Sequence, residues 1–333
     1  MITAFYRDAS LGAGRTGGIR QAFVRDPKGL DANAVWLDLN NPSFDEERSV
    51  KALLGIAIPN REEIWRNHIT NHMYADGGVI YMNAAVIHKA DAAHPKTSAI
   101  TFIVAPACLV TIRYTYPTSF EHFQRRLTNN GDACPTPHHI LGGLLEEMVA
   151  RVAFHSELID DGLDDLAHQV FADHAFENRQ GNPSLIMRRL LQKLGGLNQL
   201  NAKAYESLNS FLRLLNFYRD ELGDAHPGLT RRLSVLLHET QTLADHSSFL
   251  TNQIGFQLDA SLGMISVEQN LIAKIFTIAA VFFLPPTLIS SIYGMNFQHM
   301  PELSWVGGYP MAIGLMIAAA GGTFVYFKKK DWL

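Results

Sequence analysis

The first part of the chain mixes short apolar runs with helical repeats. Short runs of apolar or alternating residues predict β-strands at 34–39, 78–82, 99–104 and 108–113. Helical spacing of the apolar residues predicts helices at 45–54 and 61–69. We therefore expect residues 1–137 to form an α/β domain.

After residue 137 the pattern changes to long helices. Helical spacing extends over 138–177 and 185–222, with glycine- and proline-containing turns at 181–183 and 223–228. A third helical stretch begins near residue 230 and meets no proline before Pro285. At 1.5 Å per residue, a helix that continues to residue 292 is roughly 95 Å long. Such a helix needs partners to stay folded, which indicates lateral association with further copies of the chain.

Two uncharged apolar segments, 275–292 and 309–327, follow one another near the C-terminus. Each approaches the ~20 residues that a helix needs to cross a hydrocarbon core of ~30 Å. Two such segments in an otherwise charged chain are hard to place in a soluble core. They predict two membrane helices, with 293–308 as the connecting loop and 328–333 as a basic tail.

The basic residues predict how these helices are oriented. Lys274 precedes the first segment, and Lys328, Lys329 and Lys330 follow the second. The connecting loop contains no lysine or arginine and one acid, Glu302. Because lysine and arginine accumulate on the cytoplasmic side, both termini are expected inside the cell.

Composition narrows the class of protein only a little. A formal charge of −4 over 333 residues gives no sign of a nucleic-acid binder. The two cysteines, Cys108 and Cys134, are too few for a disulfide framework, and residues 1–30 carry several charges and no apolar core. We expect a reducing compartment and no cleaved signal peptide.

One face of the first membrane helix carries mostly small and hydroxyl-bearing residues. Such a stripe either lets helices pack closely or lines a hydrated path, and its spacing does not distinguish the two. Pro285 and Pro286 remove backbone donors, which either kinks the helix or frees carbonyl groups to face a lumen. The residues of this stripe are Asn270, Ala273, Thr277, Ala280, Leu284, Thr287 and Ser291.

A short motif, Gly294-Met295-Asn296, follows this helix directly. Phe297 and Met300-Pro301-Glu302-Leu303 come next, then the second apolar helix and the ending 326–333. In this order and setting the motif resembles the CorA family of magnesium transporters, closely over residues 268–333. The rest of the chain is compatible with that family in order and length.

The resemblance implies a CorA-like homopentameric funnel in the cell inner membrane, with an α/β cytoplasmic domain, a long α-helical stalk and a two-helix transmembrane region. It implies a cytoplasmic α/β domain at 1–137, an acidic helical hairpin at 138–228 and a stalk helix at 229–292, with its membrane part at about 274–292. Gly294-Met295-Asn296 would form the periplasmic entrance. There the side-chain carbonyl of Asn296 and the backbone carbonyl of Gly294 would face an ion that keeps its water shell, which suits magnesium because it dehydrates reluctantly.

The resemblance also implies roles for residues along the long helix. Asn270, Thr287 and Ser291 would face the pore, and Asp259 matches one of the family's acids on the inner part of the helix. Lys274 and Lys328 to Lys330 would form a basic collar at the inner mouth, or act only as positive-inside anchors.

One position departs from the family pattern. Counted back without gaps from Asn296, the regulatory aspartate of the long helix falls on Val235, which cannot bind a metal. A different regulatory site would then involve His238, Glu239, Asp76 or Asp245.

The helix expected at 138–177 is rich in acids, which form either a solvated face or a cation reservoir. Neither His-Glu-x-x-His nor Cys-x-x-Cys occurs among the fourteen histidines and two cysteines, so we expect no defined zinc site. The acids are Glu146, Glu147, Glu157, Asp160, Asp161, Asp164, Asp165, Asp173 and Glu177.

We expect a passive channel for Mg²⁺, with Co²⁺ and Ni²⁺ as lesser substrates, that uses no cofactor. Residues 12–18 are glycine-rich but lack the Gly-Lys-Ser/Thr ending of a phosphate-binding loop, so they are expected to form a turn. The alternatives are a Zn²⁺ transporter of the related ZntB branch and a membrane-anchored sensor or scaffold. An enzyme is the least expected class, because no nucleophile, base and orienting residue occur at an interpretable spacing.

Overall fold

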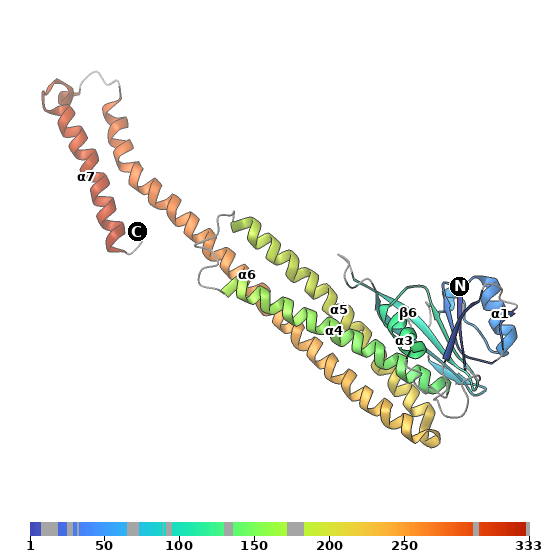
Figure 1. Cartoon of the computed structure of the whole chain (residues 1–333). Coiled ribbons are helices and arrows are strands. Elements are labelled where there is room, and N and C mark those ends of the chain that lie inside the picture. Colours follow the sequence, from blue (N-terminus) through green and yellow to red (C-terminus); the bar gives the residue numbers. More distant parts are fainter. Residues whose placement is uncertain are drawn as a thin grey trace. The chain divides into compact units, whose positions relative to one another are not determined.

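The computed structural model describes residues 1–7, 19–24, 29–31, 33–64, 73–88, 90, 95–129, 136–171, 183–295 and 300–330. The chain forms two compact units, residues 1–258 and 259–333. Figure 1 shows a sheet and several long helices in the first unit, and the end of helix α6 with helix α7 in the second.

The first unit is built on a seven-stranded sheet in the order β2-β1-β3-β7-β6-β5-β4. Strands β3 and β7 pair in parallel, and the other neighbours are antiparallel. A parallel pair needs a long connection, which helix α1 (Phe44–Leu54) and the strands between them provide. The strands are β1 (Ile2–Arg7), β2 (Ile19–Val24), β3 (Ala34–Asn40), β4 (Tyr74–Asp76), β5 (Val79–His88), β6 (Lys96–Val104) and β7 (Leu109–Arg113).

Helix α1 has local start and stop signals. The Ser43 hydroxyl accepts a hydrogen bond from the backbone N–H of Glu46, and the Glu46 carboxylate accepts one from the backbone N–H of Ser43. Gly55 ends the helix with a φ of 67°, a left-handed conformation that favours glycine.

The two faces of the sheet contribute to separate apolar cores. One face packs Trp36, Met82 and Phe102 with α3 (Thr118–Asn129) and the long helices. The other packs Leu39 with Val50 of α1. Because successive residues of a strand point to opposite faces, a sheet covered on both sides needs nearly continuous apolar strands.

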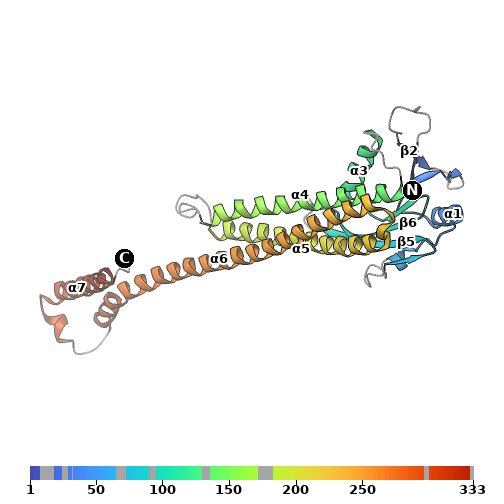
Figure 2. The same ribbon diagram turned by 90° about the horizontal axis from the view of Figure 1, so that it is seen from below.

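Three long helices complete the first unit: α4 (Pro137–Phe171), α5 (Pro183–Leu222) and the first part of α6 (Pro227–Tyr293), which follows the short η2 (Gly223–Ala225). They lie side by side (Figure 2). Buried polar contacts set their register: the Asn201 amide donates to the Ser247 carbonyl (2.9 Å), and the Gln257 amide donates to the Leu163 carbonyl (2.9 Å).

Helix α5 also binds the backbone of β5. The Ser207 hydroxyl donates to the carbonyl of Ala85, and the Ser210 hydroxyl accepts from the N–H of Ala85. These two serines attach the helical layer to the sheet and satisfy backbone groups that would otherwise be buried without a partner.

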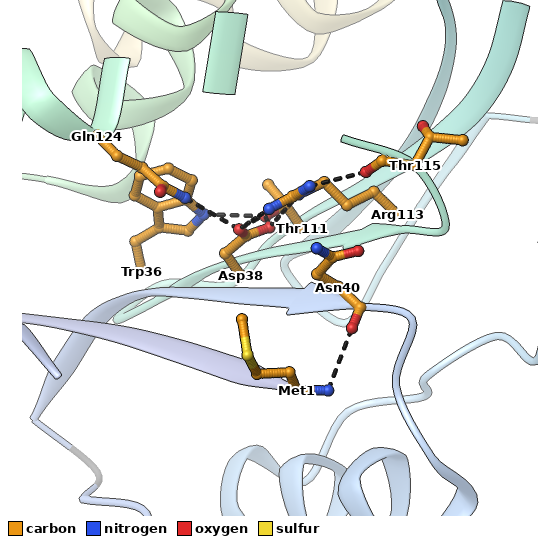
Figure 3. Close-up of polar contacts among 8 residues, drawn as sticks. All are labelled: Met1, Trp36, Asp38, Asn40, Thr111, Arg113, Thr115 and Gln124. Carbon is orange, nitrogen blue, oxygen red and sulfur yellow. Dashed lines mark hydrogen bonds and ion pairs between the residues drawn. The ribbon is translucent and has the colours of Figure 1, made fainter. Parts of the chain in front are cut away.

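A buried ion pair joins β3, β7 and α3 (Figure 3). The Arg113 guanidinium donates to the Asp38 carboxylate at 2.8–3.2 Å, and Asp38 is fully buried. Thr111 and Gln124 also donate to Asp38 (2.9 and 3.0 Å), and the Trp36 indole N–H donates to the Thr111 hydroxyl (3.0 Å). The network therefore satisfies the buried charges.

The structure confirms the expected α/β fold and long helices. The four expected strands correspond to β3, β5, β6 and β7, and the helix expected at 45–54 is α1. Strands β1, β2 and β4 and helix α3 were not predicted. Residues 61–64 are helical, whereas the remainder of the helix expected at 61–69, the turn expected at 12–18 and the end of the helix expected at 138–177 lie outside the described residues.

Candidate functional site

The small-residue stripe of α6 lies on an exposed face of the second unit. All of its residues, from Asn270 to Ser291, are exposed in the single chain, and Leu284 is 64% exposed. Around the helix, the centres of this stripe and of a half-buried stripe are about 150° apart. The single chain therefore leaves the small-residue face uncovered. The half-buried stripe consists of Lys274, Ile278, Phe282, Pro285, Pro286, Ile289 and Tyr293.

Two threonine hydroxyls on this face donate back to their own helix. The Thr277 hydroxyl donates to the Ala273 carbonyl (2.8 Å), and the Thr287 hydroxyl donates to the Phe283 carbonyl (2.7 Å). Each hydroxyl hydrogen is thereby committed, so the exposed oxygen offers acceptor lone pairs. An acceptor on this face suits a partner that donates hydrogen bonds, such as water.

The helix continues through Pro285 and Pro286. Neither residue has a backbone N–H, so the carbonyls of Val281 and Phe282 lack their usual donor four residues further on. These carbonyls are available to water or to another polar group.

Helix α6 ends where the Gly294-Met295-Asn296 motif begins. The N–H of Gly294 donates to the Ser290 carbonyl (2.9 Å), and the N–H of Met295 donates to the Ile292 carbonyl (3.2 Å). A Cβ at Gly294 would lie 3.2 Å from the Ser290 oxygen, a tight contact with backbone. Met295 is 49% exposed, whereas Asn296 lies outside the described residues.

The loop after the motif contains the short helix η3 (Pro301–Ser304), followed by α7 (Gly308–Lys329). At Gly307 a Cβ would lie 2.8 Å from the Trp305 ring, so the backbone approaches that ring as closely as only glycine allows. Of Glu302 the structure describes the backbone alone.

The basic residues expected at the inner mouth belong to both helices of the second unit. Lys274 is half-buried on α6, and Lys328, Lys329 and Lys330 are exposed at the end of α7. The Lys330 ammonium lies 5.7 Å from the centre of the Tyr326 ring.

The residues considered for regulation lie on the first unit, and Asp259, the acid expected on the inner part of the long helix, lies at the start of the second. Val235 is 54% exposed, and His238, Glu239, Asp245, Asp259 and Asp76 are exposed as well. In the part of the chain that the structure describes, no three His, Cys, Asp or Glu side chains come together to hold a metal ion. A single chain thus does not assemble the alternative regulatory site from its described residues.

His238 and Glu239 line a groove of about 560 Å³ between α4 and α6. Two acids of α4 on its rim are paired: Glu146 with Arg232 of α6 (2.7 Å) and Glu147 with Arg126 of α3 (3.0 Å). Further along α4, Glu157, Asp161, Asp164 and Asp165 are exposed, while Asp173 and Glu177 lie outside the described residues. Sequence reasoning did not identify the ion pairs, because their partners are far apart in the chain.

Helices α6 and α7 each contain an apolar stretch long enough to cross a membrane. In α6 none of that stretch is buried, and in α7 11% of it is. A soluble core helix would be mostly buried, so these stretches suit a lipid environment. The fold and this site define a class: an α/β protein with a long helix and two C-terminal membrane helices.

Comparisons with known proteins identify the family within that class. The family described as "CorA-like Mg2+ transporter protein" matches residues 31–329. The magnesium transport protein CorA of Escherichia coli (strain K12) is 30% identical over 301 residues, which cover 90% of this chain and 92% of that protein. The chain therefore belongs to the CorA-like Mg²⁺ transporter family.

Solved structures agree on the fold. The complete CorA magnesium transporter from Methanocaldococcus jannaschii matches with a TM-score of 0.77 at 17% identity, covering 100% of this chain and 99% of that one. The ZntB cytoplasmic domain from Vibrio parahaemolyticus matches with a TM-score of 0.57 at 8% identity. The match covers 80% of this chain and 98% of that one.

Proposed function

We propose that the chain forms a homopentameric channel that admits Mg²⁺ through the cell inner membrane, with Co²⁺ and Ni²⁺ as lesser substrates. The observation that carries the proposal is the Gly294-Met295-Asn296 motif directly after a membrane helix with an uncovered face of small residues, in a chain that belongs to the CorA-like family. Five copies around one axis would cover that face. The membrane potential would drive entry with about 2.3 kcal/mol per charge per 100 mV.

The pore face offers chemistry that suits a hydrated ion. The water molecules around Mg²⁺ donate hydrogen bonds outward and exchange slowly. Rings of Thr277 and Thr287 oxygens would accept those bonds without removing the water. We propose the same role at the entrance for the Asn296 side chain and the Gly294 carbonyl, with Met295 beside them.

We propose that the other residues of the small-residue stripe also line the pore. Asn270 would lie at its inner end and Ser291 at its outer end, with Ala273, Ala280 and Leu284 between them. We propose that both termini are cytoplasmic, with Lys274 and Lys328 to Lys330 as a basic collar at the inner mouth and Glu302 in the periplasmic loop.

We also propose the division of the chain expected from its sequence: a cytoplasmic α/β domain to residue 137, a helical hairpin to 228 and a stalk that enters the membrane near 274. Val235 would leave this protein without the family's usual sensor on the stalk. Regulation by internal Mg²⁺ would then depend on a site between copies, built from His238 and Glu239 with Asp76 or Asp245 of a neighbouring copy, and Asp259 would attract cations near the inner mouth.

A Zn²⁺ transporter of the ZntB branch is the second candidate. A ZntB cytoplasmic domain shares the fold, and a match at 8% identity carries no ion preference. The 30% identity to a magnesium transport protein over 90% of the chain favours Mg²⁺.

Uptake into dye-loaded liposomes that contain the purified protein tests the proposal. We expect Mg²⁺ entry that is lost in Asn296→Ala and kept in Asn252→Ala, a matched change at an exposed position of α6 in the first unit. Zn²⁺ entry without Mg²⁺ entry would select the second candidate, and no ion entry would favour a sensor or scaffold. Varying the Mg²⁺ concentration inside the liposomes would show whether internal Mg²⁺ regulates this protein, which carries Val235 where the family has an aspartate.

A further inference from the structure

Three histidines meet where α4 begins, α5 ends and α6 begins. His138 and His139 are in the first turn of α4, and His226 precedes Pro227, the first residue of α6. The ring centres of His138 and His226 are 4.9 Å apart, with the planes tilted by 40°. The His138 ring also stacks on Tyr218 of α5, with ring centres 6.1 Å apart and an interplanar angle of 17°. His138 therefore contacts both of the other helix ends.

A hydrogen bond joins His138 to α5. Nδ1 of His138 lies 2.8 Å from the hydroxyl of Tyr218, which is fully buried. Burial raises the pKa of the Tyr218 phenol, so the hydroxyl keeps its hydrogen and needs an acceptor for it. A neutral imidazole with a bare Nδ1 accepts that hydrogen, whereas a protonated imidazole carries its own hydrogen there.

The groups that act on the His138 and His139 rings through their charge are all basic. Burial lowers the pKa of His138 first, and His226 and His139 lower it further. Burial also lowers the pKa of His139, followed by Arg232 and His226. Protonation therefore places like charges close together in a partly buried site.

The other charged groups at this junction come from each helix. Asp220 of α5 is paired with Arg219 (3.0 Å), and Glu146 of α4 is paired with Arg232 of α6 (2.7 Å), so both carboxylates already have cationic partners. Glu221 at the end of α5 and Arg231 in the first turn of α6 are exposed, and Asp224 lies in the turn between these helices.

We propose that His138, Tyr218 and His226 form an acid-sensitive clasp, which holds the start of α6 against α4 and α5 at neutral pH and loosens when the histidines are protonated. Because burial lowers the pKa of His138 below the ordinary imidazole value of about 6.5, its ring is neutral at neutral pH and the clasp is closed. As the pH falls through the lowered pKa of His138, its ring gains a hydrogen at Nδ1 and a positive charge, can no longer accept from Tyr218, and lies in a partly buried site beside other basic groups. Because α6 continues into the first membrane segment, the clasp would make transport sensitive to cytoplasmic pH, and this last step rests on the proposed function.

Hydrogen exchange of the full chain in lipid nanodiscs tests the clasp at about pH 7.5 and about pH 5, because the pKa of His138 lies below the ordinary imidazole value of about 6.5. After correction for intrinsic rates, we expect the amides of 229–237 to exchange at least about fivefold faster at the lower pH. His138→Gln keeps an acceptor for Tyr218 and cannot become charged, so it should remove this acid effect. His246→Gln is the matched control on α6, since its ring stacks on Phe249 of the same helix, and it should keep the effect.

His138→Lys places a permanent charge in the clasp and should speed exchange at the higher pH as well. The proposal is wrong if exchange at the start of α6 in the unmodified protein does not change with pH, or if His138→Gln retains the full acid effect. The exchange measurement requires no ion transport, so failure of the clasp and failure of the proposed function are separable. Mg²⁺ uptake at the two internal pH values then tests the link between them.

Discussion

The Thr287 hydroxyl donates a hydrogen bond to the carbonyl of Phe283, one turn earlier in α6, at 2.7 Å. The bond lies directly beside Pro285 and Pro286, where the helix loses two backbone donors. It commits the hydroxyl hydrogen and leaves the oxygen of an exposed residue as an acceptor. In the proposed pore, this geometry produces a ring of acceptors for the water shell of the ion.

Replacing Thr287 with valine keeps the shape of the side chain but removes the acceptor. We expect Mg²⁺ flux to fall about tenfold, which corresponds to ~1.4 kcal/mol of lost stabilisation and is at the upper end of the range for a hydrogen bond between neutral groups. Thr287→Ser keeps the hydroxyl and should retain most of the flux. Liposome uptake measures both variants, and equal flux in Thr287→Val and the unmodified protein would show that this oxygen does not contact the permeating ion.

The Asp38–Arg113 ion pair predicts a large asymmetry between single and double variants. Asp38→Leu leaves a buried guanidinium without its partner and should lower the free energy of unfolding by about 3–5 kcal/mol. Asp38→Leu combined with Arg113→Met removes both charges and should be less destabilising than Asp38→Leu alone. Thermal unfolding of the detergent-solubilised protein tests this order, and a double variant that is the less stable of the two would contradict it.

The Asn201–Ser247 contact predicts a stability effect that is specific to the α5–α6 interface. The Asn201 side-chain amide donates to the Ser247 carbonyl and the Thr251 hydroxyl (both 2.9 Å), and the Ser247 hydroxyl donates to Oδ1 of the Asn201 side chain (2.8 Å). Asn201→Leu removes three hydrogen bonds between α5 and α6 and should cost about 1–3 kcal/mol of stability.

The matched control for that change is Asn216→Leu, on the same helix. The exposed Asn216 amide donates only within its helix, to the Leu212 carbonyl (2.9 Å). Its replacement should change stability by less than about 0.5 kcal/mol. Chemical denaturation compares the two, and equal losses would mean that the contact with Ser247 is not what Asn201 contributes.

Cys108 should be inert in the folded protein. The side chain is fully buried, and burial raises the pKa of its thiol to about 12. Near pH 8 only about one thiol in ten thousand would be ionised, and the thiolate is the reactive form. In a Cys134→Ser background, we expect iodoacetamide to label Cys108 only after denaturation. Stoichiometric labelling of the folded protein would show that the apolar core around Cys108, beside β7, opens to solvent.

The elements that the sequence predicted are those with strong local signals. The two membrane helices follow from uncharged stretches of sufficient length, and β3, β5, β6 and β7 from apolar runs. Strands β1, β2 and β4 and helix α3 were missed, because short or mixed segments acquire their structure from the surfaces they pack against.

The same division applies to the candidate site. The Gly294-Met295-Asn296 motif and the stripe from Asn270 to Ser291 are local in the chain, so a helical repeat and a short motif were enough to find them. Their role in a pore stays a prediction. That the stripe is uncovered in the single chain, opposite a half-buried stripe, emerged only from the structure.

The sequence by itself determined the family, the two membrane segments, the long helices and four of the strands, because apolar period, segment length and a short motif are properties of neighbouring residues. Tertiary structure alone decided which distant residues meet. Asp38 and Arg113 are 75 residues apart, His138 and Tyr218 are 80 apart, and Asn201 and Ser247 are 46 apart. Such pairs depend on the strand order and on the register of the long helices, which many weak packing contacts set together and no local pattern records.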